Sequence, residues 1–304
     1  MRHQRPTYEG RPLARPDEEV VDQGLGFDLQ TLASRRQLLR AFGLGATVLG
    51  LAACGTNGSS TSSSGSASTS TSSTSGSTTA SGEIPDETAG PYPGDGSNGP
   101  DVLEQSGIVR SDIRNSFGTA SGTAQGVPMT LELTITDMAG GNKPFAGTAV
   151  YVWHCDREGR YSMYSDAIKD QNYLRGVQVA DSSGKVRFTS IFPACYSGRW
   201  PHIHFEVYPD QASITDASKA IAISQVALPK DTCTTVYQQS GYEQSVTNLS
   251  RVSLDSDNVF GDDGAAHQLG TVTGSVGSGL TVALAVPVDT GTTPTGGGAP
   301  PGSR

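Results

Sequence analysis

The stretch Gly198-Arg-Trp-Pro-His-Ile-His-Phe205 is the most informative part of this chain. In a β-strand, successive side chains point to opposite faces of the sheet, so His202 and His204 share one face. Ile203 and Phe205 then point to the other face, toward a core. Two imidazoles side by side on a rigid strand make up half of a metal site.

The sequence around this strand predicts an all-β domain. Leu131, Leu133 and Ile135 alternate with polar residues, which is typical of a half-buried strand. Short strands separated by Gly- and Asn-rich turns favour a β-sandwich over an α/β fold. No helical periodicity extends beyond two or three turns. The predicted strands are 130–136, 149–154, 185–192, 201–208, 220–228 and 280–288.

The first part of the chain is predicted to be a targeting segment, residues 1–54. Ser34-Arg-Arg-Gln-Leu-Leu-Arg40 is typical of a twin-arginine export signal, and the apolar stretch 41–53 after it is too short to span a bilayer. Leu51-Ala-Ala-Cys54 resembles a bacterial lipobox, so we expect Cys54 to carry a lipid. The alternative is an ordinary cleaved signal, in which Cys54 is incidental. The expected location is the outer face of the cytoplasmic membrane, held by the lipid alone, or the medium.

Residues 55–82 consist almost entirely of Ser, Thr, Gly and Ala, a composition that predicts a flexible tether. One domain is then expected over 83–290, followed by a disordered tail over 291–304. The net charge of −9 argues against nucleic acid as a partner. The domain contains no Gly-rich phosphate loop or dinucleotide-binding fingerprint.

Three segments resemble the intradiol ring-cleavage dioxygenases: 150–162 (VYVWHCDREGRYS), 173–188 (YLRGVQVADSSGKVRF) and 190–207 (SIFPACYSGRWPHIHFEV). The resemblance covers roughly residues 83–290 and implies the β-sandwich catalytic core of that family. It also implies an enzyme that cleaves catechol-type aromatics with O2 to products of the cis,cis-muconate type. The implied cofactor is non-haem Fe(III), and the implied ligands are Tyr161, Tyr196, His202 and His204.

The same resemblance assigns roles to residues around the metal. Tyr196 is expected to be the axial ligand that the substrate displaces, and it accepts a substrate proton. Arg199 is expected to stabilise negative charge on the substrate ring, and Gln225 to hydrogen-bond the ligands or the substrate. Trp200, Gly90 and Tyr92 are expected to line the substrate pocket.

Three cysteines remain in the exported domain: Cys155, Cys195 and Cys233. An oxidising compartment allows one disulfide among them. We favour Cys195 with Cys233, and a pairing with Cys155 is nearly as plausible. No Cys-x-x-Cys spacing supports a zinc site.

Two other functions stay open at this point. The domain could be a non-catalytic cell-surface module that binds aromatic or polysaccharide ligands and keeps a degenerate iron site. It could instead be a zinc or copper enzyme that uses His202 and His204, although such sites usually add a third histidine or a carboxylate. The sequence determines neither the exact substrate nor the oligomeric state.

Overall fold

The computed structural model describes residues 82–294 and two short paired strands near the start, β1 (Thr7–Tyr8) and β2 (Arg11–Pro12). The predicted export signal, Cys54 and almost all of the predicted tether lie outside the described residues. The predicted domain, 83–290, falls within them.

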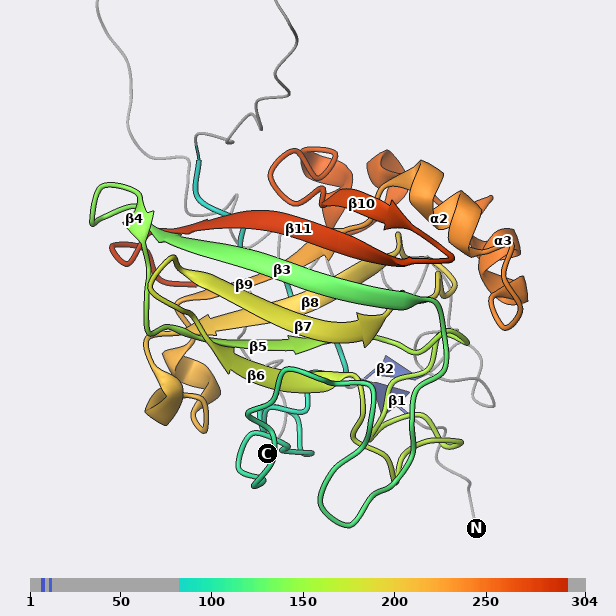
Figure 1. Cartoon of the computed structure of the whole chain (residues 1–304), viewed down its shortest axis with the longest axis horizontal. Helices are drawn as coiled ribbons and strands as arrows, with labels where there is room; N and C mark the ends of the chain where they lie inside the picture. Colours follow the sequence, from blue (N-terminus) through green and yellow to red (C-terminus); the bar gives the residue numbers. More distant parts are fainter. Residues whose placement is uncertain (1–6, 9–10, 13–81, 295–304) are drawn as a thin grey trace, which may run out of the picture.

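Two β-sheets form the framework of the domain, which confirms the predicted all-β sandwich (Figure 1). The strands of the first sheet are β10 (Thr271–Ser275), β11 (Gly279–Val288), β3 (Pro128–Asp137) and β7 (Lys185–Ile191), with β4 (Lys143–Pro144) paired to one end of β3. The strands of the second sheet, in spatial order, are β6 (Arg175–Val179), β5 (Ala149–Trp153), β8 (His202–Tyr208) and β9 (Ala222–Ala227).

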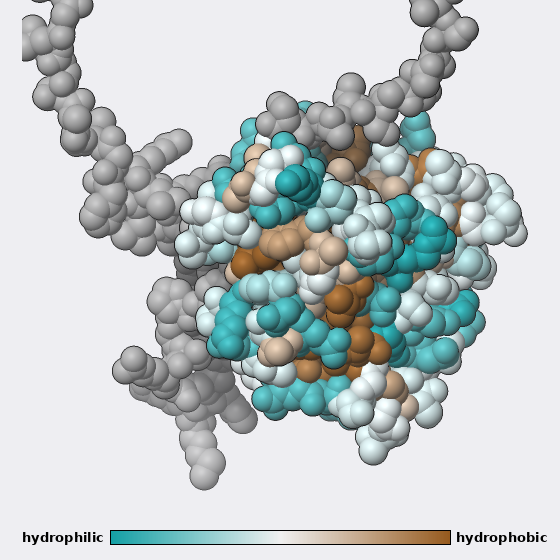
Figure 2. Space-filling model, turned by 60° about the vertical axis from the view of Figure 1, so that its left-hand side comes forward, coloured by the Kyte–Doolittle hydropathy of each residue, from teal (hydrophilic) through white to brown (hydrophobic). Residues whose placement is uncertain are grey.

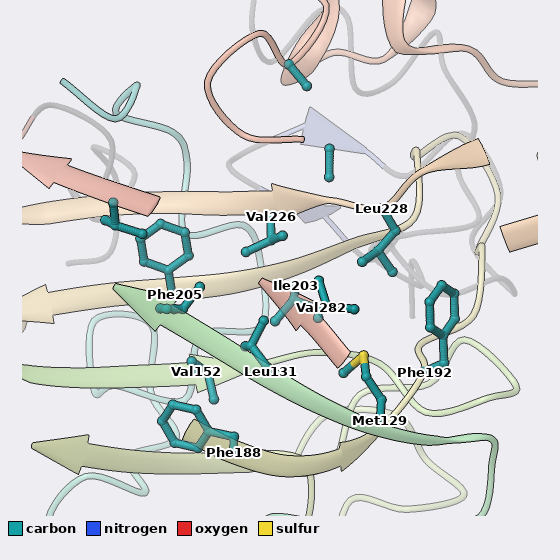
Figure 3. Packing of buried hydrophobic residues seen from close by; sticks show 14 of the residues in the cluster. Met129, Leu131, Val152, Phe188, Phe192, Ile203, Phe205, Val226, Leu228 and Val282 are labelled. Atoms are coloured by element: carbon teal, nitrogen blue, oxygen red, sulfur yellow. The ribbon is translucent and has the colours of Figure 1, made fainter. Parts of the chain in front are cut away.

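The main hydrophobic core lies between the two sheets (Figure 3). Leu131 and Phe188 of the first sheet pack in one cluster with Val152, Ile203 and Phe205 of the second. Each of these five side chains is at most 1% exposed. Full burial of one such side chain contributes about 1.5–3 kcal/mol.

The second sheet is buried on both faces. Every residue of β5, β8 and β9 is buried, and a second hydrophobic cluster covers the outer face of this sheet. Tyr151 and Trp153 belong to this outer cluster, whereas Val150 and Val152 belong to the core between the sheets. Burial on both faces explains why β5 is apolar throughout instead of alternating.

Hydrophobic residues also reach the surface, and Figure 2 shows a band of them between hydrophilic residues on one side of the molecule. Among the described residues, three of the most exposed large aliphatic side chains lie at the edges of the second sheet. Val179 belongs to the edge strand β6, Val109 forms a bridge to the same strand, and Leu269 forms a bridge to the edge strand β9. Short crossing segments therefore cover both edges, which blocks pairing with another chain.

All six predicted strands are present, with ends that differ by at most two residues. The prediction omitted β4, β6 and β10. The helices α2 (Lys230–Val236) and α3 (Glu243–Leu249) have seven residues each, which agrees with the lack of a long helical pattern. The 3-10 turns are η2 (Gln211–Ser213), η3 (Ala217–Lys219), η4 (Leu254–Ser256) and η5 (Phe260–Asp262). Within the part of the chain that the structure describes, no helix is both long and apolar enough to cross a membrane.

Candidate metal centre

Four side chains meet on the outer face of the second sheet: those of Tyr161, Tyr196, His202 and His204. The Nε2 atoms of His202 and His204 are 3.0 Å apart, and Tyr196 Oη is 3.2 Å from His202 Nε2. The Tyr161 ring centroid lies 5.9 Å from that of Tyr196 and 6.3 Å from that of His204. The structure therefore brings together all four residues that the sequence assigns to the metal.

The two histidines owe their placement to the alternation of β8. Ile203 and Phe205 point into the core between the sheets, so His202 and His204 point to the outer face. Trp153, directly opposite on β5, stacks on the His204 ring at a centroid distance of 4.8 Å and an interplanar angle of 5°. The indole therefore fixes the plane of the imidazole.

A tight turn after β5 positions Tyr161. The Asp156 carboxylate accepts hydrogen bonds from the backbone N–H groups of Glu158 and Arg160, which closes the turn. Gly159 has a φ of +86°, and a Cβ there would lie 3.2 Å from the Tyr196 Cβ. Glycine is favoured at position 159 because its backbone lies in the left-handed region and because the turn passes close to Tyr196.

The helix α3 holds the segment that carries Tyr196. Ser245 Oγ accepts a hydrogen bond from Cys195 N at 3.0 Å, and Asn248 Nδ2 donates to Cys195 O at 2.9 Å. Both side chains come from one face of α3 and fix the peptide next to the ligand. Tyr196 is therefore anchored from outside the sheet.

The histidine nitrogens are available as metal ligands. His202 Nδ1 lies 2.6 Å from the carbonyl oxygen of Trp200, to which it donates, so the Nε2 lone pair faces His204 and Tyr196. Burial lowers the pKa of His202, and the nearby Arg199 cation lowers it further. Burial also lowers the pKa of His204, with His202 as the next contributor. Neutral imidazoles are the form that binds a metal.

The tyrosine hydroxyls also fit a cation. Tyr161 Oη is buried and has no hydrogen-bond partner among the described residues. Burial raises the pKa of Tyr161 and of Tyr196, so both phenols keep their protons until a strong cation ionises them. An unpartnered buried oxygen next to two imidazole lone pairs therefore fits a metal that binds hard anionic oxygen.

A zinc or copper site built on histidines and carboxylates has less support. Among residues 82–294, no group of three or more His, Cys, Asp or Glu side chains is arranged to hold a metal ion. The further oxygen donors that the structure places beside His202 and His204 are those of Tyr196 and Tyr161.

A buried ion pair lies close enough to the four donors to affect the pKa of each of them. Arg199 Nε donates to Asp257 Oδ2 at 3.0 Å, and Arg199 Nη2 donates to Gln225 Oε1 at 2.7 Å. Burial lowers the pKa of Arg199, but Asp257 and Tyr196 outweigh it, so the net shift is upward and the cation is permanent. Asp257 was missed in the sequence because it lies 58 residues from Arg199, in a loop without a recognisable pattern.

The segment 88–94 (Thr-Ala-Gly-Pro-Tyr-Pro-Gly) lies against His204 and Tyr161 and forms one wall of the site; it contains Gly90 and Tyr92, for which a place in the substrate pocket stays a prediction. A Cβ on Gly90 would lie 3.2 Å from the Cε1 atom of His204, and Gly90 has a φ of +72°. The Tyr92 ring lies 5.1 Å from the Tyr161 ring. The Tyr92 carbonyl oxygen accepts a hydrogen bond from Arg175 Nη2 at 2.9 Å, and the Gly90 N–H donates to the Thr88 hydroxyl at 3.1 Å, so both residues are held in place in this wall.

The predicted role of Trp200 as a pocket wall does not agree with its position. Its side chain packs in the core between the sheets, and its Nε1 donates to the carbonyl oxygen of Leu228 at 2.9 Å. Trp200 precedes β8, so the alternation of the strand does not carry it to the outer face. What Trp200 contributes to the site is its carbonyl oxygen, which orients His202.

The predicted disulfide between Cys195 and Cys233 is absent: both residues, like Cys155, are buried free thiols. Two of the sulfurs donate to backbone carbonyl oxygens. Cys195 Sγ donates to Arg199 O at 3.5 Å and Cys155 Sγ to Ala194 O at 3.7 Å, and the Cys233 thiol interacts with the Tyr237 hydroxyl. Burial raises the pKa of all three thiols, which keeps them protonated.

Comparisons with known proteins agree on one class of enzyme. A family model described as "Dioxygenase" matches residues 98–212. Chlorocatechol 1,2-dioxygenase of Rhodococcus opacus is 42% identical over 53 residues, which are 17% of this chain and 21% of that protein. Catechol 1,2-dioxygenase of a Pseudomonas strain is 37% identical over 71 residues, 23% of this chain and 22% of that protein.

These matches span only about one fifth of the length of the curated relatives. Among solved structures, an intradiol ring-cleavage dioxygenase from Tetranychus urticae is similar over 71% of this chain and 98% of its own, with a TM-score of 0.55 and 23% identity. At that identity the likeness concerns the fold. The matched range 98–212 includes all four donor residues and Arg199, whereas Gly90, Tyr92, Gln225 and Asp257 lie outside it.

Proposed function

The chain belongs to the intradiol ring-cleavage dioxygenase family, and from this premise we propose that it cleaves catechol-type aromatics with O2 at a non-haem Fe(III) ion. Both atoms of O2 enter the product, a dicarboxylate of the cis,cis-muconate type. The observation that carries the proposal is the convergence of two imidazoles and two phenols on one buried point. Tyr161, Tyr196, His202 and His204 would hold the iron.

When bound, Fe(III) supplies the Lewis acidity that ionises the catechol and makes it reactive toward O2. The protein residues do the rest. Two phenolates offset most of the charge of a trivalent ion, so the buried site carries little net charge. As a phenolate, Tyr196 would accept a proton from an incoming catechol hydroxyl.

Arg199 stabilises negative charge on the substrate. Asp257 and Gln225 hold its guanidinium from behind, so the cation does not have to reorganise as charge develops. Gln225 in turn donates to the Thr88 carbonyl oxygen at 2.9 Å, which joins this network to the wall of the site. Gln225 therefore acts by positioning Arg199.

The intact donor set favours an enzyme over a non-catalytic binding module. In a binding module that does not catalyse a reaction, replacement of a metal ligand or of Arg199 would not impair the function. Here Tyr196 Oη and His204 Nε2 both lie next to His202 Nε2, the Tyr161 ring packs against Tyr196 and His204, and Arg199 keeps its ion pair with Asp257. A buried cation of this kind is costly to keep and is expected where it acts on a substrate.

We further propose that the enzyme works outside the cytoplasm, anchored through a lipid on Cys54. This rests on the sequence alone: the twin-arginine stretch 34–40 and the lipobox-like stretch 51–54 occur in the right order. Mass spectrometry of the protein from a membrane fraction tests it. A mature protein beginning at an unmodified residue other than Cys54 would contradict it.

The first experiment measures the iron content and visible absorption of the full chain, with and without catechol. We expect about one iron per chain, a broad phenolate-to-Fe(III) band that shifts with catechol, and a dicarboxylate product detected by chromatography. Tyr161→Phe should weaken the band. Tyr237→Phe is the matched control, because its buried hydroxyl hydrogen-bonds Pro193 O outside the site. A protein that stays colourless after iron reconstitution would overturn the proposal.

A further inference from the structure

The wall segment 88–94 crosses the whole outer face of the second sheet, as its contacts show strand by strand. Thr88 O accepts a hydrogen bond from Gln225 on β9, and Gly90 packs on His204 of β8. Pro93 O accepts a hydrogen bond from the Tyr151 hydroxyl on β5 at 2.7 Å. At the far edge, the segment meets Arg175 on β6. The order β9, β8, β5, β6 is the spatial order of the sheet, so we call this segment the strap.

The strap ends on a fully buried guanidinium. Arg175 is 1% exposed, and none of the carboxylates among residues 82–294 forms an ion pair with it. Its Nη1 donates to Pro93 O at 2.6 Å, and its Nη2 donates to Tyr92 O at 2.9 Å. Two consecutive carbonyl groups of the strap are therefore bound to one side chain.

The same guanidinium also binds the loop that carries Tyr161. Its Nη2 donates to the Ser162 carbonyl oxygen at 3.0 Å and its Nε to the Ser162 hydroxyl at 3.1 Å. Nη1 makes a further bond to the Tyr151 hydroxyl at 3.0 Å. Ser162 follows Tyr161 directly, so Arg175 connects the loop that carries a candidate metal ligand to the strap that faces it.

We propose that Arg175 is a positioning residue that fixes the strap against the Tyr161 loop and thereby sets the width of the aromatic substrate site. Tyr92 on the strap and Tyr161 on the loop face each other at 5.1 Å, and both depend on this side chain. Only arginine offers five N–H donors in a rigid fork, so lysine cannot replace it. The substrate part of this inference rests on the proposed function.

The test compares Arg175→Lys with a matched control, Arg110→Lys, in the full iron-loaded chain. Arg110 also donates to backbone carbonyls, those of Arg175 and Asn172, but it does not touch the strap. For Arg175→Lys we expect KM for catechol to rise about tenfold or more, with kcat within about threefold of the wild type, because the site is looser but the donors remain. Iron content should not change. For Arg110→Lys both constants should stay at the wild-type values.

Hydrogen exchange supplies a second measurement that does not depend on catalysis. Gly94 N donates to the Tyr164 hydroxyl at 2.9 Å, so its exchange reports on the strap. We expect faster exchange over 88–94 in Arg175→Lys and not in Arg110→Lys. If the wild type has no turnover, the proposed function fails, but this measurement still tests whether Arg175 fixes the strap.

Three outcomes overturn the inference. One is an unchanged KM in a folded Arg175→Lys. Another is an equal rise in KM in Arg110→Lys. The last is strap exchange that does not change. If Arg175→Lys does not fold, Tyr151→Phe replaces it, since it removes one hydroxyl that joins Pro93 O and Arg175. That variant should shift KM and strap exchange in the same direction by less, and unchanged values would reject the inference.

Discussion

At the scale of single residues, the site combines predictable and unpredictable parts. The His pair could be placed from strand alternation, and Tyr161 and Tyr196 from their resemblance to known segments. Asp257 could not, because only the tertiary fold brings it to Arg199. Trp200 was assigned to the wrong side, since the residues before a strand do not follow its alternation.

Tyr196 should matter more for turnover than for holding iron. In Tyr196→Phe the three other donors remain, but the base that accepts the substrate proton is gone. We expect kcat/KM for catechol to fall roughly 100-fold or more, with iron content near that of the wild type. Steady-state kinetics and metal analysis on the same preparation check this. Loss of all the iron would mean that Tyr196 is not a displaceable ligand.

Asp257 should contribute to the stability of the fold as well as hold the Arg199 guanidinium in place. Its side chain is 0% exposed and that of Arg199 is 10% exposed. In Asp257→Ala the guanidinium stays buried without its carboxylate, so the free energy of unfolding should fall by about 3–5 kcal/mol. Urea unfolding measures it. Asp112→Ala is the control, because its ion pair with Arg114 is 40% exposed on both sides and should contribute about 1 kcal/mol or less.

At the scale of elements, β8 serves the core and the site with alternate residues. Strands with a clear apolar pattern, such as β3, could be predicted almost to their ends. The strand β6 could not, because it begins with Arg175 and Gly176, which lack the usual strand pattern. Arg175 makes its contacts with the strap from this position, so tertiary contacts rather than local strand propensity account for the residue found there.

Truncating the core face of β8 should destabilise the sandwich without touching a donor. Phe205 is fully buried between the sheets, and Phe205→Ala should lower the free energy of unfolding by about 3–5 kcal/mol. Phe117→Ala is the control, because Phe117 is only half-buried under Arg110. Equal losses in the two variants would show that the core between the sheets does not dominate stability.

At the scale of the whole molecule, Glu87 links stability to pH. Burial and then Asp262 raise its pKa from 4.5 to about 8, and Asp263 adds to this while Arg199 and Gln268 oppose it. The folded protein thus keeps a proton that the unfolded chain loses above about pH 4.5. Stability should therefore be highest at the acidic end of this window and fall toward pH 8, by at most about 1.4 kcal/mol per pH unit.

The variant Glu87→Gln should flatten this slope, measured by urea unfolding at several pH values between 5 and 8. Glu104→Gln is the control, since Glu104 is exposed and lies outside this group of charges. An identical slope in Glu87→Gln and the wild type would assign the pH dependence to other groups.

The parallel pairing of β11 with β3 has a consequence for how the chain is made. Leu280 pairs with Met129, which is roughly 150 residues earlier, and such distant pairings form late and slowly. The first sheet therefore stays incomplete on the ribosome until β11 has been synthesised. Until then the edge of β3 that later pairs with β11 is free, so the nascent chain exposes a strand that can pair wrongly. Cells that make this protein quickly should depend on a chaperone at that moment.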